Sequence, residues 1–144
     1  MTDKNIVSEF VQVRGADAIP RMHRMLHVDR SITDINIKDS TCTGNNFTAL
    51  LYQSRWGTTG SVAWLLRQDP PPEVDVRDSH QYTPLMIAAS SFKDSEGKVR
   101  LLLDHGADRD MKDCNGYTAL YYARLFNKPA VIDMLENHRP DVSR

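Results

Sequence analysis

The sequence lacks any apolar run approaching the roughly 18 residues that a membrane-spanning helix requires, and no signal-type hydrophobic stretch follows Met1. Cysteine is scarce as well, with only Cys42 and Cys114. Both fall in turns two units apart in the pattern described below, which places them roughly 20 Å from each other if neighbouring helices stack about 8–10 Å apart. That separation excludes a disulfide. We therefore expect free, reduced thiols in a soluble protein of the cytoplasm or nucleus.

An excess of one charge is also absent. The 18 basic and 19 acidic residues give a net charge of −1, which offers no reason to expect nucleic acid or an anionic membrane as the partner. No Cys-x-x-Cys pair, glycine-rich phosphate loop or nucleophile elbow occurs. Gly57 and Gly60 indicate a turn between helices, because neither a lysine nor a strand accompanies them. We expect no catalytic constellation and no cofactor.

Two small groups of titratable residues have alternative explanations. His23 and His27 share one helix face, but no third ligand lies nearby, so solvated surface histidines are favoured over a metal site. Asp39, Asp78 and Asp113 recur at one position of the repeat, which favours a structural role in capping a hairpin over a carboxylate cluster.

What the sequence does contain is a period. Thr48, Thr83 and Thr118 each begin a Thr-Ala/Pro-Leu triplet, and successive triplets lie 35 residues apart. Charged segments precede them at 34–39, 75–78 and 109–113, and apolar runs follow at 62–66, 99–103 and 131–135. Three landmarks in three copies indicate internal repeats.

The middle copy shows how one unit folds. Thr83 is placed to cap a helix with its hydroxyl, and Pro84 falls at the first helical position, where no amide hydrogen bond is lost. A second helix follows, with an apolar part at 99–103, and Gly106 ends it because glycine accepts the left-handed conformation. Two such short helices cannot bury both faces alone, so each unit needs its neighbours.

These landmarks resemble the ankyrin repeat family, whose unit has about 33 residues and a T-P-L-H-x-A signature. The resemblance covers roughly residues 34–138, and it implies an all-α repeat solenoid of paired antiparallel helices joined by β-hairpin loops. Only the middle copy keeps Thr-Pro-Leu, and Leu51, Met86 and Tyr121 replace the family's histidine. The departures at turns are a long hairpin at 40–46, the triple proline 70–72 and an enlarged loop at 92–97.

The chain is expected to form one domain. Apolar spacing predicts helices at 3–14 and 17–26, so residues 1–33 are interpreted as a divergent N-terminal capping repeat. Repeats are expected at 34–73 and 74–108, followed by a C-terminal capping repeat at 109–138 and a frayed tail at 139–144. Trp64 aligns with an apolar core position, whereas Trp56 suits either packing on the neighbouring repeat or contact with a partner.

In ankyrin proteins, partners usually dock on the concave side, built from hairpin tips and the exposed ends of the first helices. Carried over by position, this resemblance implies a protein-binding surface in which Phe47, Tyr82 and Tyr117 form an aromatic column, with packing against the next hairpin as the alternative. The expected contact residues are Phe47, Arg55, Trp56, Ser79, His80, Tyr82, Ser90, Ser91, Cys114, Asn115, Tyr117, Leu125 and Phe126.

The favoured function is a non-catalytic protein–protein interaction module, an adaptor or complex subunit with a protein partner. One alternative is an enzyme regulator, since the size resembles that of ankyrin-type inhibitors of cyclin-dependent kinases in architecture alone. Another is a pathogen effector that imitates a host scaffold. The chain is expected to be a monomer or one subunit of a hetero-complex.

Overall fold

The computed structural model describes residues 3–40 and 46–138, and helices are the dominant element in both ranges. A short π-helical segment, η1, continues the second helix. The elements in chain order are α1 (Lys4–Val11), α2 (Ala18–His23), η1 (Arg24–Val28), α3 (Ala49–Trp56), α4 (Thr59–Leu66), α5 (Pro84–Ser90), α6 (Ser95–Asp104), α7 (Ala119–Leu125) and α8 (Pro129–Asn137).

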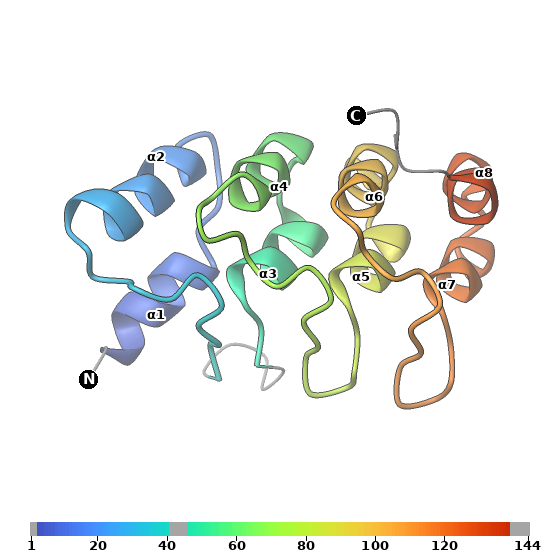
Figure 1. Ribbon diagram of the computed structural model, residues 1–144, viewed down its shortest axis with the longest axis horizontal. Coiled ribbons are helices and arrows are strands. Elements are labelled where there is room, and N and C mark those ends of the chain that lie inside the picture. The colour runs from blue at the N-terminus through green and yellow to red at the C-terminus, as the bar shows by residue number, and fades with distance from the viewer. Residues whose placement is uncertain (1–2, 41–45, 139–144) are drawn as a thin grey trace.

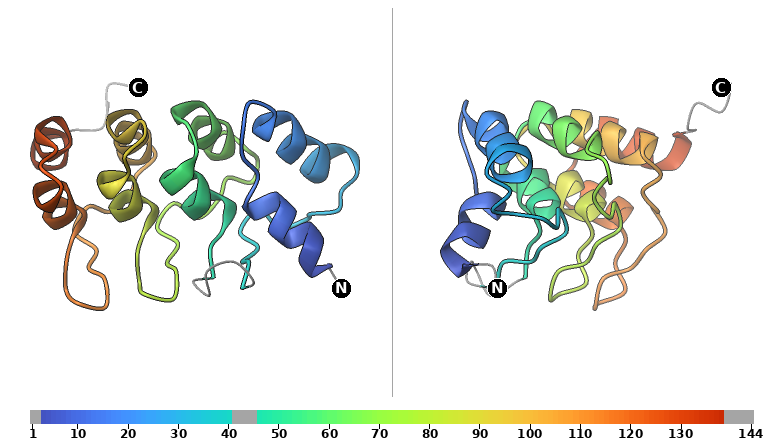
Figure 2. Two further views of the ribbon diagram at one scale, coloured as in Figure 1. Left: turned by 180° about the vertical axis from the view of Figure 1, so that it is seen from behind. Right: turned by 60° about the vertical axis from the view of Figure 1, so that its left-hand side comes forward.

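The helices form pairs that stack side by side in two layers (Figure 1). One layer holds α1, α3, α5 and α7, and the other holds α2, α4, α6 and α8, with α1 and α8 at opposite ends. The helices α3, α5 and α7 pack on their pair mates, and the helices of each layer pack on their neighbours in the same layer. Loops extend from the helical layers toward one side, as both views of Figure 2 show. The predicted all-α repeat solenoid is confirmed.

The three repeated threonines cap the first helices. In α3, α5 and α7 the hydroxyl oxygens of Thr48, Thr83 and Thr118 accept hydrogen bonds from the backbone amide three residues later, at 3.3–3.4 Å. Pro84 occupies the first turn of α5 as predicted. Each cap satisfies a helix amide that would otherwise lack a partner. The 35-residue period therefore reflects one capping interaction used three times.

Two of the three repeated aspartates, Asp78 and Asp113, stabilise their hairpin loops, as predicted. Asp78 Oδ1 accepts from the amides of His80 and Tyr82, both at 2.9 Å, and Asp113 Oδ1 accepts from those of Asn115 and Tyr117 at 2.8 and 3.0 Å. The two residues differ at their second oxygen. Tyr122 donates its hydroxyl hydrogen to Asp113 Oδ2, whereas Asp78 Oδ2 is buried without a hydrogen-bond partner among the described residues.

Replacing Asp113 with alanine should lower the free energy of unfolding by about 1.5–3 kcal/mol, because a charged acceptor of several buried hydrogen bonds is lost. Asp113→Asn keeps an acceptor oxygen and should cost less. Burial raises the pKa of the Asp113 carboxyl, but hydrogen bonds from Tyr122, Tyr117, Asn115 and Gly116 outweigh it, so the pKa lies below 3.8. Its contribution is thus present above that pH and is lost as pH falls through the folded-state pKa. Urea unfolding of both variants at pH 7 and pH 3 checks this, and an equal loss for asparagine and alanine would contradict it.

Side chains from each repeat reach back to complete the first helix of the preceding repeat. Gln53 Nε2 donates to the Val13 carbonyl at 2.7 Å, just beyond α1. Lys98 Nζ donates to the Ser54 carbonyl at 3.1 Å in the last turn of α3, and Lys128 Nζ donates to the carbonyl of Ser91 after α5. The Ser54 carbonyl is in the last turn of α3, and the carbonyls of Val13 and Ser91 lie just beyond α1 and α5, where backbone carbonyls lack partners within a helix. The three junctions therefore share one kind of hydrogen bond, in which a side chain of the later repeat donates to a backbone carbonyl of the earlier one.

Several boundaries differ from the predictions. The predicted loop at 92–97 is shorter, since α6 begins at Ser95. Gly97 lies inside this helix. Glycine is needed there because a Cβ would collide with the Thr59 side chain of the preceding repeat. The first helix ends at Val11 rather than 14, and the second continues through η1 to Val28. Gly106 ends the second helix of the middle copy with a φ of +86°, as predicted. Residues 41–45 of the long hairpin, with Cys42, and the tail at 139–144 lie outside the described residues.

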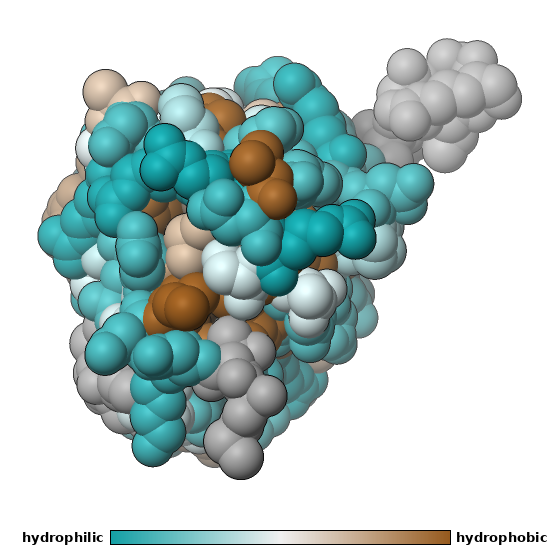
Figure 3. Space-filling model, turned by 90° about the vertical axis from the view of Figure 1, so that its left-hand side faces the viewer, coloured by the Kyte–Doolittle hydropathy of each residue, from teal (hydrophilic) through white to brown (hydrophobic). Residues whose placement is uncertain are grey.

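The N-terminal end of the stack is largely hydrophilic, with separate apolar areas rather than one continuous patch (Figure 3). An end repeat must present such a face because no further repeat covers it. Inward-facing Val7, Phe10 and Met22 belong to the core instead. The interpretation of residues 1–33 as a capping repeat stays a prediction.

Candidate functional site

The predicted contact residues at the hairpin tips divide into exposed and buried ones. Ser79, His80, Cys114 and Asn115 are exposed, and Tyr117 is 39% exposed. Phe47 is a correction, because its side chain is only 2% exposed. Its backbone pairs with Asp39 in an antiparallel bridge, and its ring lies 6.1 Å from that of Trp56. Phe47 is therefore a core residue and offers no surface to a partner.

Trp56 packs within the array, as one of its two predicted roles requires, and contact with a partner stays a prediction. It is half-buried, packs against the core and lies 4.7 Å from the Tyr52 ring. Two guanidinium groups lie over the Trp56 ring, that of Arg14 at 5.3 Å and that of Arg55 at 5.0 Å from the centroid. Trp64, expected in the core, is likewise half-buried and lies edge-on to His23 at 6.5 Å.

The ends of the first helices supply one further correction. Arg55, Leu125 and Phe126 are exposed and Ser90 is half-buried, but Ser91 is only 3% exposed. Ser91 Oγ accepts from Lys98 Nζ at 3.3 Å and lies 3.0 Å from the Arg55 carbonyl oxygen. The Ser91 side chain is buried and hydrogen-bonded at this junction between repeats, so it is not part of the candidate surface.

Four predicted residues instead meet around one concavity, which we call the central pocket. It has a volume of about 170 Å³ and opens between the ends of α3, α5 and α7. Tyr82 and Phe126 form apolar walls, and Arg55 supplies a cation that has no ion-pair partner among the described side chains. The lining residues are Arg55, Tyr82, Met86, Ile87, Ser90, Tyr122 and Phe126.

A tyrosine cluster lies beside this pocket and replaces the expected aromatic column. Tyr82 and Tyr117 both pack edge-on against Tyr122, at centroid distances of 5.9 and 6.3 Å. Tyr117 stacks on Tyr121 at 3.9 Å. Burial raises the pKa of Tyr122, and its hydrogen bonds to Asp113 and Tyr82 raise it further, so the Tyr122 hydroxyl stays protonated at physiological pH. Tyr82 and Tyr122 are the members of the cluster that line the pocket.

Sequence reasoning missed several residues of this surface. Phe92 is 93% exposed and packs edge-on against Phe126 at 6.1 Å, while Lys128 Nζ lies 5.9 Å from its ring centroid. A phenylalanine within a polar loop was the available signal. Tyr121 and Tyr122, which lie in α7, were not expected at this surface, yet Tyr121 is exposed and Tyr122 is half-buried.

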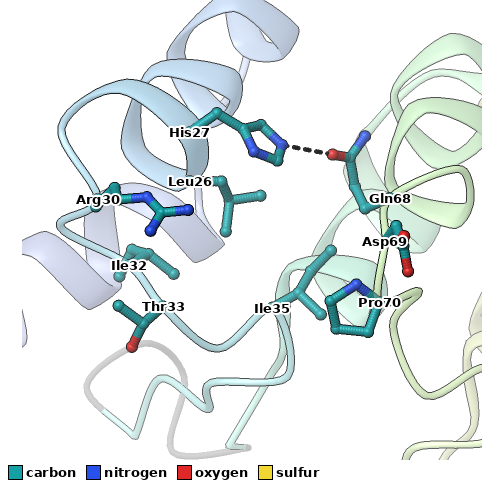
Figure 4. A pocket seen from close by; sticks show the side chains of 9 residues that line it. All are labelled: Leu26, His27, Arg30, Ile32, Thr33, Ile35, Gln68, Asp69 and Pro70. Carbon is teal, nitrogen blue, oxygen red and sulfur yellow. Dashed lines mark hydrogen bonds between the residues drawn. The ribbon is translucent and has the colours of Figure 1, made fainter.

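A second cavity of about 200 Å³ lies at the first junction between repeats, apart from the central pocket (Figure 4). Leu26, Ile35 and Pro70 line it, and a hydrogen bond of 2.8 Å between His27 and Gln68 spans it. None of the predicted contact residues lines this cavity. We interpret it as part of the packing between the first two repeats.

No group of three or more His, Cys, Asp or Glu side chains in residues 3–40 and 46–138 is arranged to hold a metal ion. His23 and His27 are exposed with ring centroids 5.0 Å apart, and His105 Nδ1 lies 2.8 Å from the Leu101 carbonyl oxygen at the end of α6. Cys114 is free and exposed. Within the described ranges, no helix has the length and apolar character needed to cross a membrane.

Comparison with known proteins identifies the class. The family described as "Ankyrin repeats (3 copies)" matches residues 17–108 and 73–144, so this chain belongs to the ankyrin repeat family. Members of this family are generally protein–protein interaction modules and are typically non-catalytic.

Two individual proteins are similar to this chain, one in sequence and one in fold. A protein of Treponema pallidum (strain Nichols), whose name describes it as ankyrin repeat-containing, is 32% identical over 89 residues, which are 62% of this chain and 28% of the relative. The crystal structure of EF0377, an ankyrin repeat protein, superposes with a TM-score of 0.73 at 22% identity, covering 96% of this chain and 65% of that one. This chain therefore spans little more than a quarter of the relative and about two thirds of the solved structure.

Proposed function

We propose that this domain is a non-catalytic adaptor or complex subunit that docks a protein partner on the side formed by its hairpin loops and the ends of its first helices. The observation that carries the proposal is the central pocket. Its walls are aromatic and aliphatic, it remains open to solvent, and it lies at the middle of the repeat array. Aromatic and arginine side chains around a small pocket are typical of the residues that dominate binding energy at protein interfaces.

The apolar surface around this pocket also supports the proposal. Phe126 is 43% exposed, and Leu125 and Phe92 beside it are exposed even further. Solvent-exposed apolar side chains that gather at one place are favoured by burial against a partner. The neighbouring hairpin tips carry exposed His80 and Asn115, which are suited to the polar rim of an interface.

The test compares a Tyr82→Ala/Phe126→Ala variant with the wild type in affinity capture from cell lysate, with captured proteins quantified by mass spectrometry. A partner that uses the central pocket should bind the variant roughly tenfold to a hundredfold more weakly. Val28→Ala is the matched control, because Val28 is 66% exposed and lies in η1, away from the pocket.

Circular dichroism should show that the double variant keeps its helices, because Phe126 is exposed and Tyr82 is only half-buried. Equal capture by the wild type and the folded double variant would place the docking surface elsewhere. Loss of helical structure would instead show that the tyrosine cluster is required for the fold.

A further inference from the structure

The turns between paired helices and the last turn of α3 carry a second feature beside the central pocket, a row of cations. It consists of Arg14, Arg55, Lys93 and Lys128, which we call the cationic strip. Arg14, Arg55 and Lys93 are exposed, and Lys128 is half-buried. The ion pairs in the described residues involve other cations, so the strip has no carboxylate in contact. With a net charge of −1 for the whole chain, four cations without acidic partners are a local concentration of positive charge.

Aromatic rings alternate with these cations. Arg14 and Arg55 both lie over the Trp56 ring, at 5.3 and 5.0 Å from its centroid, and Lys128 lies 5.9 Å from the Phe92 ring centroid. Such contacts fix the positions of long side chains that would otherwise lose more entropy on binding. The strip is therefore a partly pre-organised surface.

Two concavities meet the strip at the contact between Arg55 and Trp56, since Trp56 lines one of them and Arg55 lines the other. One, of about 350 Å³, is lined by Arg14, Lys93 and Trp56 together with polar Gln53, Thr58 and Ser61, and no acidic side chain lines it. The other is the central pocket itself, where Arg55 stands beside the walls formed by Tyr82 and Phe126. A peptide segment that occupies both concavities would contact cations in the one lined by Arg14 and Lys93 and apolar side chains in the central pocket.

Acidic residues border the strip but do not neutralise it. Asp94 accepts a hydrogen bond from the Thr59 amide at 3.2 Å, which directs it toward the backbone. Asp17 is the N-cap residue of α2, and Glu96 and Asp94 line a further concavity together with Phe92 and Lys128, the half-buried member of the strip. A nucleic acid carries negative charge at every step of its backbone and would meet these carboxylates. A peptide can place carboxylates only where the cations are.

We propose that the cationic strip and the central pocket together bind an extended segment of a protein partner that carries acidic side chains beside an apolar one. The carboxylates lie against Arg14, Arg55 and Lys93, and the apolar side chain enters the pocket between Tyr82 and Phe126. The inference rests on the proposed function and adds the chemistry of the partner to it. Charge complementarity is what selects this partner, because opposite charges at an interface set specificity and association rate.

The experiment uses a phage-displayed library of random peptides panned against the full chain, followed by fluorescence anisotropy with one labelled peptide from the selection. We expect enrichment of Asp and Glu beside Leu, Phe or Trp. Binding should weaken as salt rises from about 50 to about 300 mM, because the exposed cations are screened. The double charge reversal Arg55→Glu/Lys93→Glu should weaken it about tenfold or more.

The matched control is Arg67→Glu/Arg100→Glu, which changes the net charge equally at exposed positions on α6 and at the end of α4. It should alter the affinity less than about twofold if contact with the strip, rather than overall charge, is responsible. Equal weakening by both reversals overturns the assignment of the acidic segment to the strip. Competition by a single-stranded oligonucleotide at equal concentration overturns the choice of a protein partner.

The outcomes also separate this inference from the proposed function. Neutral peptides that require Tyr82 and Phe126 but tolerate the charge reversal would refute the acidic partner and leave the docking surface intact. Peptides that tolerate both the charge reversal and the Tyr82→Ala/Phe126→Ala change would refute both, as would a library from which nothing is enriched.

Discussion

Leu102→Ala is expected to lower the free energy of unfolding by about 2–5 kcal/mol, the range for removing a large aliphatic side chain from a core. Leu102 is fully buried in α6, which packs on α5 within its own pair and on α4 and α8 in the adjacent pairs. The cavity would open in the middle of the array. Because a linear array is held by contacts between neighbours, a loss there weakens two interfaces at once.

Urea unfolding followed by circular dichroism measures this change. Leu101→Ala is the matched control, since Leu101 is the adjacent residue in the same helix but is only half-buried. Its loss should be less than half that of Leu102→Ala. Leu135→Ala, in terminal α8, tests the position in the array and should cost less than the change at Leu102. A similar loss at positions 101 and 102 would show that burial in α6 is not what holds the repeat.

The free energy of unfolding should also rise with pH between about 8 and 10.5, because of Lys98. Burial lowers the pKa of this lysine from 10.5 to about 8; Asp94 opposes the change, while Lys93 and Lys128 add to it. Between these values the unfolded chain holds the proton and the folded chain has released it. The unfolded state then binds more protons, so stability increases with pH. A pKa difference of this size corresponds to about 3 kcal/mol.

Lys98→Met is the variant that isolates this effect, because methionine fills similar space and does not titrate. Guanidinium unfolding of both proteins at pH 7, 8, 9 and 10 should give a difference in stability that moves steadily in favour of the wild type. Titration of the tyrosines is common to both proteins and cancels. A difference that stays constant over this range would mean that Lys98 is not desolvated in the folded state.

The sequence predicted those parts of the fold that depend on neighbours along the chain. A threonine cap, a proline in the first turn and a glycine at the helix end act within a few residues, so Thr83, Pro84 and Gly106 could be interpreted alone. Contacts between repeats were not accessible in this way. Gly97 was assigned to a loop because nothing nearby in sequence shows that Thr59 approaches it.

Contacts between repeats also explain which residues of the candidate site were predicted wrongly. Phe47 and Ser91 occupy positions that are often exposed in such repeats. Here the Phe47 ring packs against Trp56, and Ser91 Oγ accepts a hydrogen bond from Lys98. The sequence identified those residues of the central pocket whose exposure follows from their position in the repeat, such as Arg55 and Phe126. Phe92 was missed because its exposure depends on the conformation of a turn particular to the middle repeat.

The reaching side chains of Gln53, Lys98 and Lys128 have a consequence for protein synthesis. Each leaves its own repeat to satisfy a carbonyl in the repeat before it, so the donor always emerges from the ribosome later than its acceptor. A nascent chain ending after α4 would have no donor for the Ser54 carbonyl until Lys98 had been translated. Domains that fold during translation do so from the N-terminus. We therefore expect folding of this chain to lag behind its synthesis by one repeat.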